Sequence, residues 1–244
     1  MGEWKRPLHR RIAKILALMN AEFLEQAQCY FGGGTQLVMS HREFRESRDI
    51  DFLLSSQEGL RMLRETLGER SLGRIFKGKI NLAREVRADR YAIRTFITED
   101  PAAEPLKFEI VVEARIALNG AMEDTLGVPC LKLPWAIAEK LLANADRGRA
   151  KEYRTRDVID LAFVSLDADK TAFLAGYELA QRAYGQVILR ELDEVLKMLD
   201  LDSKYRAQCV ADLLITDGKA LKEGLERLQQ FRRVLRKHAR AARA

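Results

Sequence analysis

The feature that most constrains the fold is a change of pattern near residue 130. Before it, residues 90–98 and 106–118 alternate apolar and polar side chains and flank a loop with two prolines, which predicts a β-hairpin. From Pro134 onward, apolar residues instead recur at helical spacing. These patterns predict an α+β protein. An α+β domain over residues 1–130, with a mixed sheet flanked by helices, precedes a helical bundle over residues 131–244.

The first domain opens with a helical pattern and then short strands. Residues 8–28 predict one helix, residues 29–31 a strand, and residues 35–41 a short helix. The segment DIDFLLS, residues 49–55, predicts the next strand. In the second domain, Thr155 is predicted as the N-cap residue of a helix.

Length and composition exclude several classes of protein. A chain of 244 residues is long enough to bury a sizeable core. It has no apolar run near the ~20 residues that a membrane span needs. Its three cysteines are far apart, which argues against a disulfide framework or a zinc site and for a reducing compartment. The sequence therefore predicts a cytoplasmic protein.

The net charge of +6 is concentrated at the C-terminal end of the chain. Residues 227–244 carry seven Lys and Arg and no acid. Such a basic tail is typical of a segment that binds a phosphate backbone or an acidic protein, and also of a solvated terminal helix. Both interpretations stay open. The acids Glu191, Asp193 and Glu194 are predicted to form a solvated face.

A glycine cluster separates the strand at residues 29–31 from the helix that follows. Glycine allows positive φ and a close approach of the backbone to a ligand. The unpaired N–H groups at a helix N-terminus favour an anion. Gly33, Gly34 and Thr35 are therefore candidates to hold a triphosphate, although glycine-rich strand-to-helix turns also occur without a ligand.

Two aspartates follow the glycines after a short interval. Asp49 and Asp51 are two apart on a predicted strand, so they project from the same face. Two adjacent carboxylates repel each other, and a bound Mg²⁺ would convert this repulsion into binding. The alternative is a pair of solvated acids on an edge strand.

Two Mg²⁺ ions would require a third acid. On the strand at residues 106–118, Glu109 and Glu113 both point away from the apolar face, so parity does not separate them. Either could join Asp49 and Asp51 if the two strands are neighbours. The ions would then align an attacking hydroxyl with the α-phosphate of a nucleotide. The third carboxylate could accept the proton of that hydroxyl.

These residues resemble the signature of the polymerase-beta nucleotidyltransferase superfamily, in which a glycine turn precedes a D-x-[DE] strand and a later strand supplies a third acid. More narrowly, GGTQL followed by RESRDIDF is similar to the AbiEii/MenT group of nucleotidyltransferase-like toxins. Arg45, Ser47 and Arg48 before the DID fit that group. The resemblance implies a nucleotidyltransferase-type sheet in the first domain and a role for Arg48 in nucleotide binding.

The second domain carries another motif of that group. The matching residues are Lys140, Ala143, Arg147, Arg156, Asp157, Asp160 and Leu161. Lys140 and Arg147 share one helix face, as do Asp157 and Asp160. The resemblance implies that Lys140, Arg147 and Asp160 bind the nucleotide and that Lys140 and Asp157 are catalytic. Without it, Lys140 would be interpreted as a surface cation and Asp157 as an acid favoured at a helix N-terminus.

The resemblance implies an enzyme that moves a nucleoside monophosphate from an NTP to an acceptor with Mg²⁺. It also implies a toxin with a cognate antitoxin. In some members of the group the acceptor is the 3′ end of tRNA, and the basic tail at residues 227–244 is compatible with RNA. Two alternatives stay open: the acceptor is a small molecule or a protein, or the chain is a non-catalytic module that binds a nucleotide or a partner.

Overall fold

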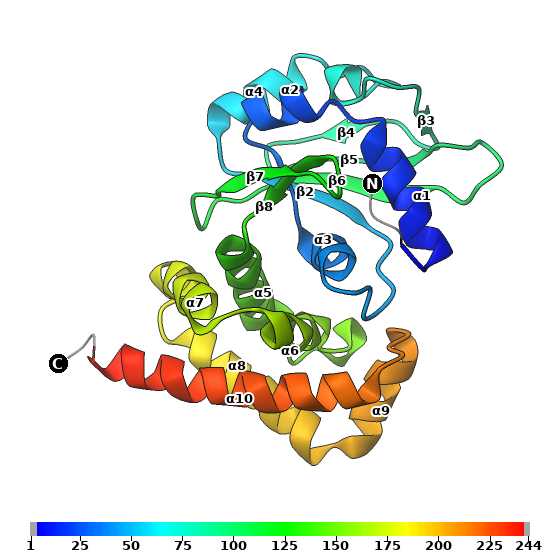
Figure 1. The fold of residues 1–244 in the computed structure, drawn as a ribbon. Helices are drawn as coiled ribbons and strands as arrows, with labels where there is room; N and C mark the ends of the chain where they lie inside the picture. Colours follow the sequence, from blue (N-terminus) through cyan, green and yellow to red (C-terminus); the bar gives the residue numbers. More distant parts are fainter. Residues whose placement is uncertain (1–3, 242–244) are drawn as a thin grey trace. The chain divides into compact units, whose positions relative to one another are not determined.

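The structure, a computed structural model, describes residues 4–241, and Figure 1 shows the fold as a ribbon. The chain forms two compact units. The first comprises the described residues up to Met39 together with Ser47–Lys132, and the second comprises Ser40–Glu46 and the described residues from Leu133 onward. The sequence predicted one division, after residue 130. The structure adds the early segment Ser40–Glu46 to the helical unit.

The first unit is built on a mixed sheet, as predicted, and the described residues give this sheet eight strands. Its strands are β1 (Tyr30–Phe31), β2 (Ile50–Leu54), β3 (Asn81–Leu82), β4 (Arg87–Ala88), β5 (Ala92–Thr98), β6 (Leu106–Val112), β7 (Gly120–Glu123) and β8 (Val128–Leu131). The strand order is β3-β5-β6-β2-β1-β8-β7, and β4 also pairs with β5. β5 and β6 form the predicted antiparallel hairpin, whereas β6 runs parallel to β2. The central strand β2 therefore lies between β6 and β1.

Three helices contribute apolar residues to the core of this sheet. They are α1 (Pro7–Ala17), α2 (Ala21–Gln26) and α4 (Gln57–Arg64). In Figure 1, α2 and α4 lie above the strands, while α1 runs beside them. The single helix predicted over residues 8–28 is wrong, because the chain turns between α1 and α2. There the side chain of Asn20 accepts a hydrogen bond from the N–H of Phe23 at 3.3 Å, which caps the start of α2.

Alternation along the strands decides which side chains face away from these helices. Ile50 and Phe52 of β2, and Phe108 of β6, are fully buried in the core. Because successive side chains of a strand point to opposite faces, Asp51 and Glu109 lie on the other face. The helix α3 (Gly33–Ser40) lies on that other side of the sheet.

The second unit is helical, as predicted. Its helices are α5 (Leu133–Arg147), α6 (Arg156–Asp167), α7 (Lys170–Tyr184), α8 (Val187–Leu201), α9 (Ser203–Asp212) and α10 (Gly218–Ala241). Short 3-10 helices, η1 (Gly73–Ile75) and η2 (Lys151–Tyr153), occur in the first and second unit, respectively. α5 packs against α6, α7 and α8, and α10 packs along α6 and α8. The segment Ser40–Glu46 takes part in this core, because Phe44 stacks on Phe163 with ring centroids 4.4 Å apart.

Thr155 occupies the predicted N-cap position of α6, but its hydroxyl does not cap the helix. Thr155 has φ +46, in the left-handed region, and its hydroxyl donates to the carbonyl of Arg154. Among the described residues, no helix combines the length and the apolar character that crossing a membrane requires.

Two acids of α8 contradict the solvated face predicted for Glu191, Asp193 and Glu194. Glu191 and Asp193 are buried. Asp193 accepts hydrogen bonds from Arg232 and Arg236 of α10, so part of the predicted basic tail is used inside the unit. Glu194 is half-buried, and its carboxylate pairs with Lys197. The physical reason is that α10 returns along α8, which a local sequence pattern does not reveal.

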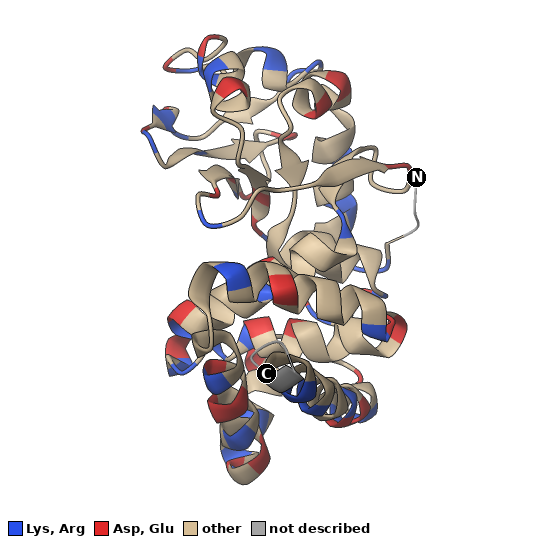
Figure 2. Cartoon of the chain, turned by 90° about the vertical axis from the view of Figure 1, so that its left-hand side faces the viewer, with Lys and Arg blue, Asp and Glu red and all other residues tan. Residues whose placement is uncertain are grey.

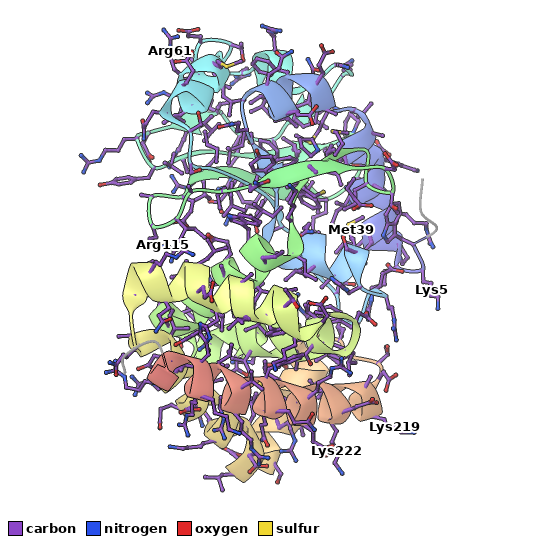
Figure 3. The ribbon with its side chains drawn as sticks, turned by 60° about the vertical axis from the view of Figure 1, so that its left-hand side comes forward. Lys5, Met39, Arg61, Arg115, Lys219 and Lys222 are labelled. Carbon is purple, nitrogen blue, oxygen red and sulfur yellow. The ribbon has the colours of Figure 1, made fainter. Side chains whose placement is uncertain are left out.

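The rest of α10 carries exposed charges of both signs, as Figure 2 shows for the helices of this unit. Lys219 and Lys222 extend outward from its first turns (Figure 3). Arg233 and Lys237 are exposed near its end. Residues 242–244 of the predicted tail lie outside the described residues.

Candidate active site

The glycine turn and the DID segment come together in the first unit. Gly33 begins α3 and has φ +71, a backbone conformation that other residues rarely adopt. A Cβ at this position would lie 3.0 Å from Oδ2 of Asp51. Glycine is therefore required for two reasons, the backbone conformation and the close approach of the carboxylate. The N-terminus of α3 and the Asp51 carboxylate are adjacent.

Thr35 fixes this arrangement from inside the protein. It is fully buried, and its hydroxyl lies 2.5 Å from the carbonyl oxygen of Asp49 and 2.9 Å from Oγ of Ser47. These bonds tie the first turn of α3 to the segment that leads into β2. The Thr35 side chain is thus used internally, and its backbone, with that of Gly34, belongs to the helix start that faces Asp51.

Both aspartates were predicted to lie on one strand, but only Asp51 does so. Asp51 is the second residue of β2, whereas Asp49 precedes the strand by one residue. Both are half-buried. The hydrogen bond from Thr35 to the Asp49 carbonyl fixes the backbone before β2. The two carboxylates are therefore carried by a restrained backbone next to a helix N-terminus.

Strand register separates the two candidates for the third acid. In the parallel pair of β2 and β6, Asp51 is the direct partner of Glu109. Glu113 lies one residue beyond β6 and is buried. Its carboxylate is held by Arg115, with Nη2 and Oε2 2.6 Å apart. Glu109, and not Glu113, is thus the neighbour of Asp51 across the sheet.

Glu109 is already engaged by two cations. Its Oε1 accepts from Nε of Arg94 at 3.0 Å, and its Oε2 accepts from Nζ of Lys107 at 2.5 Å. Among residues 4–241, no group of three or more His, Cys, Asp or Glu side chains is arranged to hold a metal ion. Asp49 and Asp51 thus remain as the candidate metal ligands of this unit, with Glu109 beside them.

The second unit brings together all four of its predicted site residues. Nζ of Lys140 lies 2.6 Å from Oδ2 of Asp160 and 3.0 Å from Oδ1 of Asp157. Arg147 donates from Nε to Oδ2 of Asp157 at 2.8 Å. Arg45 adds a bidentate pair to Asp160, with bonds of 2.6 and 2.9 Å. We call these five residues the helical ion cluster.

Burial distinguishes the helical ion cluster from ordinary surface ion pairs. Asp160 is 0% exposed, Asp157 2% and Lys140 5%. The interpretation of Lys140 as a surface cation is therefore excluded, while Asp157 does lie in the first turn of α6 as the dipole argument expects. The Arg147 side chain is 34% exposed and lies with its guanidinium 5.2 Å from the ring centroid of Tyr153. Arg147 is thus the most accessible of the four residues predicted here.

The cations keep both buried aspartates ionised. Burial alone would raise the pKa of Asp157, but Lys140 and Arg147 outweigh it and hold that pKa well below its ordinary value. For Asp160, burial is again the largest single effect, and Arg45 and Lys140 lower the net pKa. The cluster therefore carries three positive and two negative charges, a net +1.

Arg45 belongs to the RESRD motif, but the sequence pattern does not assign its side chain to a site. The signal was its place three residues before Arg48 in RESRD. The structure shows that these two arginines behave differently. Arg45 is 4% exposed and bound to Asp160, whereas Arg48 is 61% exposed with Glu104 at 4.0 Å. Arg48 remains a predicted nucleotide contact.

Comparison with known proteins places these features in a family. The chain matches the family described as "Nucleotidyl transferase AbiEii toxin, Type IV TA system" over residues 14–236. A candidate nucleotidyltransferase from H. pylori has a similar fold, with a TM-score of 0.57, 19% identity, and coverage of 94% of this chain and 95% of that chain. JHP933 from Helicobacter pylori gives a TM-score of 0.53, 18% identity, and coverage of 96% and 95%. No curated protein matches the chain.

The two structural likenesses, at these identities, show the fold alone. The family match spans the glycine turn, the DID segment and the helical ion cluster. The chain therefore belongs to the AbiEii family of nucleotidyltransferase toxins of type IV toxin–antitoxin systems.

Proposed function

We propose that this chain transfers a nucleoside monophosphate from an NTP to a hydroxyl group of RNA, with the 3′ end of tRNA as the first acceptor to test. The observation that carries the proposal is the approach of Gly33 to the Asp51 carboxylate. It joins two requirements of the reaction within one unit. A helix N-terminus favours the triphosphate, and a carboxylate next to it can hold the metal that accompanies the triphosphate.

The donor set near Gly33 fits Mg²⁺. Asp49 and Asp51 supply hard oxygen ligands, and Mg²⁺ in proteins is usually held by one or two carboxylates plus substrate phosphates. When bound, the ion would polarise the α-phosphate and stabilise the leaving pyrophosphate. The second ion expected from the sequence would need Glu109, whose two oxygens already accept from Arg94 and Lys107. We therefore assign one ion to Asp49 and Asp51.

Glu109 has a different role in this proposal. Glu109 lies beside Asp51 in the sheet. We therefore propose Glu109 as the general base that accepts the proton of the attacking hydroxyl. Arg94 and Lys107 orient its carboxylate through separate oxygens. The pairing also offsets the repulsion that two neighbouring carboxylates would otherwise produce.

The helical ion cluster contributes a second set of predicted nucleotide contacts. Its net charge of +1 supports binding of an anion, and the partly exposed Arg147 is the member best able to contact a phosphate. Asp157 holds Arg147 in place, Lys140 binds Asp157, and Asp160 fixes Lys140. We propose that Lys140 acts chiefly by positioning Asp157 and Arg147.

The biological setting follows from the family. As a member of a type IV toxin family, the chain is proposed to arrest growth when produced alone and to be countered by a cognate antitoxin. Expression of the chain and of its Asp51→Asn variant from the same promoter tests this. We expect growth arrest with the first and normal growth with the second.

The direct test incubates the full chain with each labelled NTP, Mg²⁺ and total tRNA. We expect label on the tRNA, and its loss in Asp49→Asn and Asp51→Asn. Asp124→Asn is the matched control, because Asp124 is an exposed aspartate of the same unit, in the turn between β7 and β8. Transfer that persists in both site variants would refute the metal site. Label on a protein or a small molecule instead of tRNA would support nucleotidyl transfer but refute RNA as the acceptor.

A further inference from the structure

A second basic region lies in the first unit, where the sequence analysis did not place one. Residues 70–94 carry eight Lys and Arg and two acids, so their net charge is +6. This equals the net charge of the whole chain. The excess was hidden in the overall composition because acidic residues elsewhere cancel it.

The structure folds this segment against the edge of the sheet. β3 and β4 both pair with β5. Beside them is a groove of about 430 Å³, which we call the edge groove. Its charged lining residues are Arg84, Glu85, Arg87, Arg94, Lys107 and Glu109. A second hollow of about 350 Å³ shares Arg84 and Glu85 and extends the surface toward Arg70.

Cations exceed acids in the edge groove. Four cations and two acids line it, a net charge of +2 (4 − 2). A further acid, Asp89, pairs with Arg94 at 3.1 Å. Arg84 and Arg87 are exposed, and among the described residues neither forms an ion pair with a carboxylate. These two guanidinium groups are therefore open to an anionic ligand.

Strand register connects the edge groove to the proposed catalytic carboxylates. Asp51 pairs with Glu109, Glu109 with Arg94, and Arg94 with Arg87. Directly paired residues of neighbouring strands have side chains on the same face. These four side chains thus form a row across the sheet, from the DID segment to the edge groove.

Aromatic rings accompany the cations of this region. The guanidinium of Arg84 lies 4.6 Å from the ring centroid of Phe96, and that of Arg90 lies 4.6 Å from the ring centroid of Tyr91. Phe96 lines the edge groove, and Tyr91, which is 57% exposed, presents an accessible ring in the same segment of the chain. A basic groove with aromatic side chains is typical of a surface that binds single-stranded nucleic acid, because phosphates pair with the cations and bases stack on the rings.

We propose that the edge groove binds the single-stranded end of the acceptor RNA and leads it to Asp51; this rests on the function proposed above. The order of the strands supports the assignment. β1, which leads into the glycine turn, and β6, which carries Glu109, are the two neighbours of β2. The triphosphate and the acceptor would thus reach Asp51 from opposite sides. In-line displacement at a phosphate requires this, since attacking and leaving oxygens lie on opposite sides of the phosphorus.

The test measures binding of a fluorescein-labelled single-stranded RNA of about 12 nucleotides to the full chain by anisotropy, over a range of salt concentrations. The variant Arg84→Glu/Arg87→Glu should weaken binding by at least about tenfold. Since each phosphate contact to a single strand contributes about 0.7 to the salt slope, loss of two contacts should flatten the slope by about 1.4. The control Arg233→Glu/Lys237→Glu reverses two exposed cations of α10 and should change affinity by less than about twofold.

Two further measurements keep the outcomes distinct. Tyr91→Leu should weaken RNA binding severalfold without changing the salt slope, because it removes stacking and no charge. NTP binding and the melting temperature should be unchanged in Arg84→Glu/Arg87→Glu. If that variant binds RNA as the parent does, or if the α10 control is the one that loses binding, the proposal is overturned. The proposed nucleotidyl transfer is tested separately by Asp51→Asn. If this variant loses label transfer, the proposed function holds even when the edge groove does not bind RNA. If the variant still transfers label, the proposed function is itself refuted.

Discussion

Asp51 in the first unit and Asp160 in the second are both predicted site residues, but their surroundings differ. Asp51 is half-buried on the central strand β2, with the backbone of Gly33 against its carboxylate. Asp160 is 0% exposed, with Arg45 and Lys140 on its oxygens. Partial exposure leaves room for a ligand, while full burial commits the group to its protein partners. Activity and stability are therefore expected to respond to different residues in the two units.

The largest effect is expected at Asp51. Asp51→Asn should lower nucleotidyl transfer by about 10³-fold, the loss typical of removing a charged group that acts on the transition state. The melting temperature should change little, because Asn has nearly the size of Asp and its amide oxygen can still accept hydrogen bonds. Single-turnover transfer with labelled NTP and thermal denaturation measure the two quantities. A large fall in melting temperature would contradict the comparison.

In contrast to Asp51→Asn, Lys140→Ala should chiefly lower the stability of the protein. It leaves two buried carboxylates with fewer partners, and breaking a buried ion pair typically costs about 3–5 kcal/mol of unfolding free energy. Urea denaturation followed by circular dichroism measures this. The matched control is Lys197→Ala, which removes a solvent-accessible pair with Glu194 and should leave the unfolding free energy almost unchanged. If Lys140→Ala is as stable as the parent but binds NTP weakly, Lys140 serves the ligand more than the fold.

The acid response sharpens the comparison further. The folded-state pKa values of Asp157 and Asp160 are depressed, so their contribution is complete above the ordinary aspartate pKa of about 3.9. It is lost as pH falls through the lower folded-state values, because the unfolded chain then binds more protons than the folded chain. Between pH 7 and 5 these groups should leave the unfolding free energy unchanged. Below about pH 4 the slope should approach, at most, about 1.4 kcal/mol per pH unit for each group.

Urea denaturation at a series of pH values checks this. In Asp160→Asn, one of the two groups is absent, and the slope below about pH 4 should fall by up to half. An equal slope in parent and variant would show that other carboxylates control acid unfolding.

The smallest effect is expected at Glu109. Glu109→Gln should lower transfer by about a hundredfold, the lower end of the range for loss of a general base. Glu113→Gln should leave the rate unchanged while lowering stability, since Glu113 is buried against Arg115. If the two variants exchange these phenotypes, the assignment by strand register fails.

The sequence allowed the fold to be predicted where local patterns carry it. Alternation in residues 90–98 and 106–118 predicted β5 and β6, and helical spacing predicted the second unit. The break between α1 and α2 was missed because apolar spacing continues through it, while the cap at Asn20 occupies one position. Residues 120–123 were missed as a strand because β7 is short and exposed, and only pairing with β8 makes it regular.

The sequence predicted the types of the candidate site residues and the faces on which they lie. It did not predict which residues become neighbours through strand register or through ion pairs between distant parts of the chain. Parity showed that Glu109 and Glu113 point the same way, but only the register of β2 and β6 identifies the neighbour of Asp51. Charge counts gave the tail its basic character, yet Arg232 and Arg236 are bound to Asp193, about 40 residues earlier in the chain. No local pattern contains such contacts.

The short segment Ser40–Glu46 has a consequence for how this protein can be divided or inherited. It lies early in the chain, within the sheet-forming half, but it supplies Phe44 and Arg45 to the core of the helical unit. A gene fusion that joined residues 133–244 to a different sheet would leave Asp160 without its bidentate partner. The helical half is thus not an exchangeable module, and recombination between relatives would have to transfer seven residues of the other half along with it.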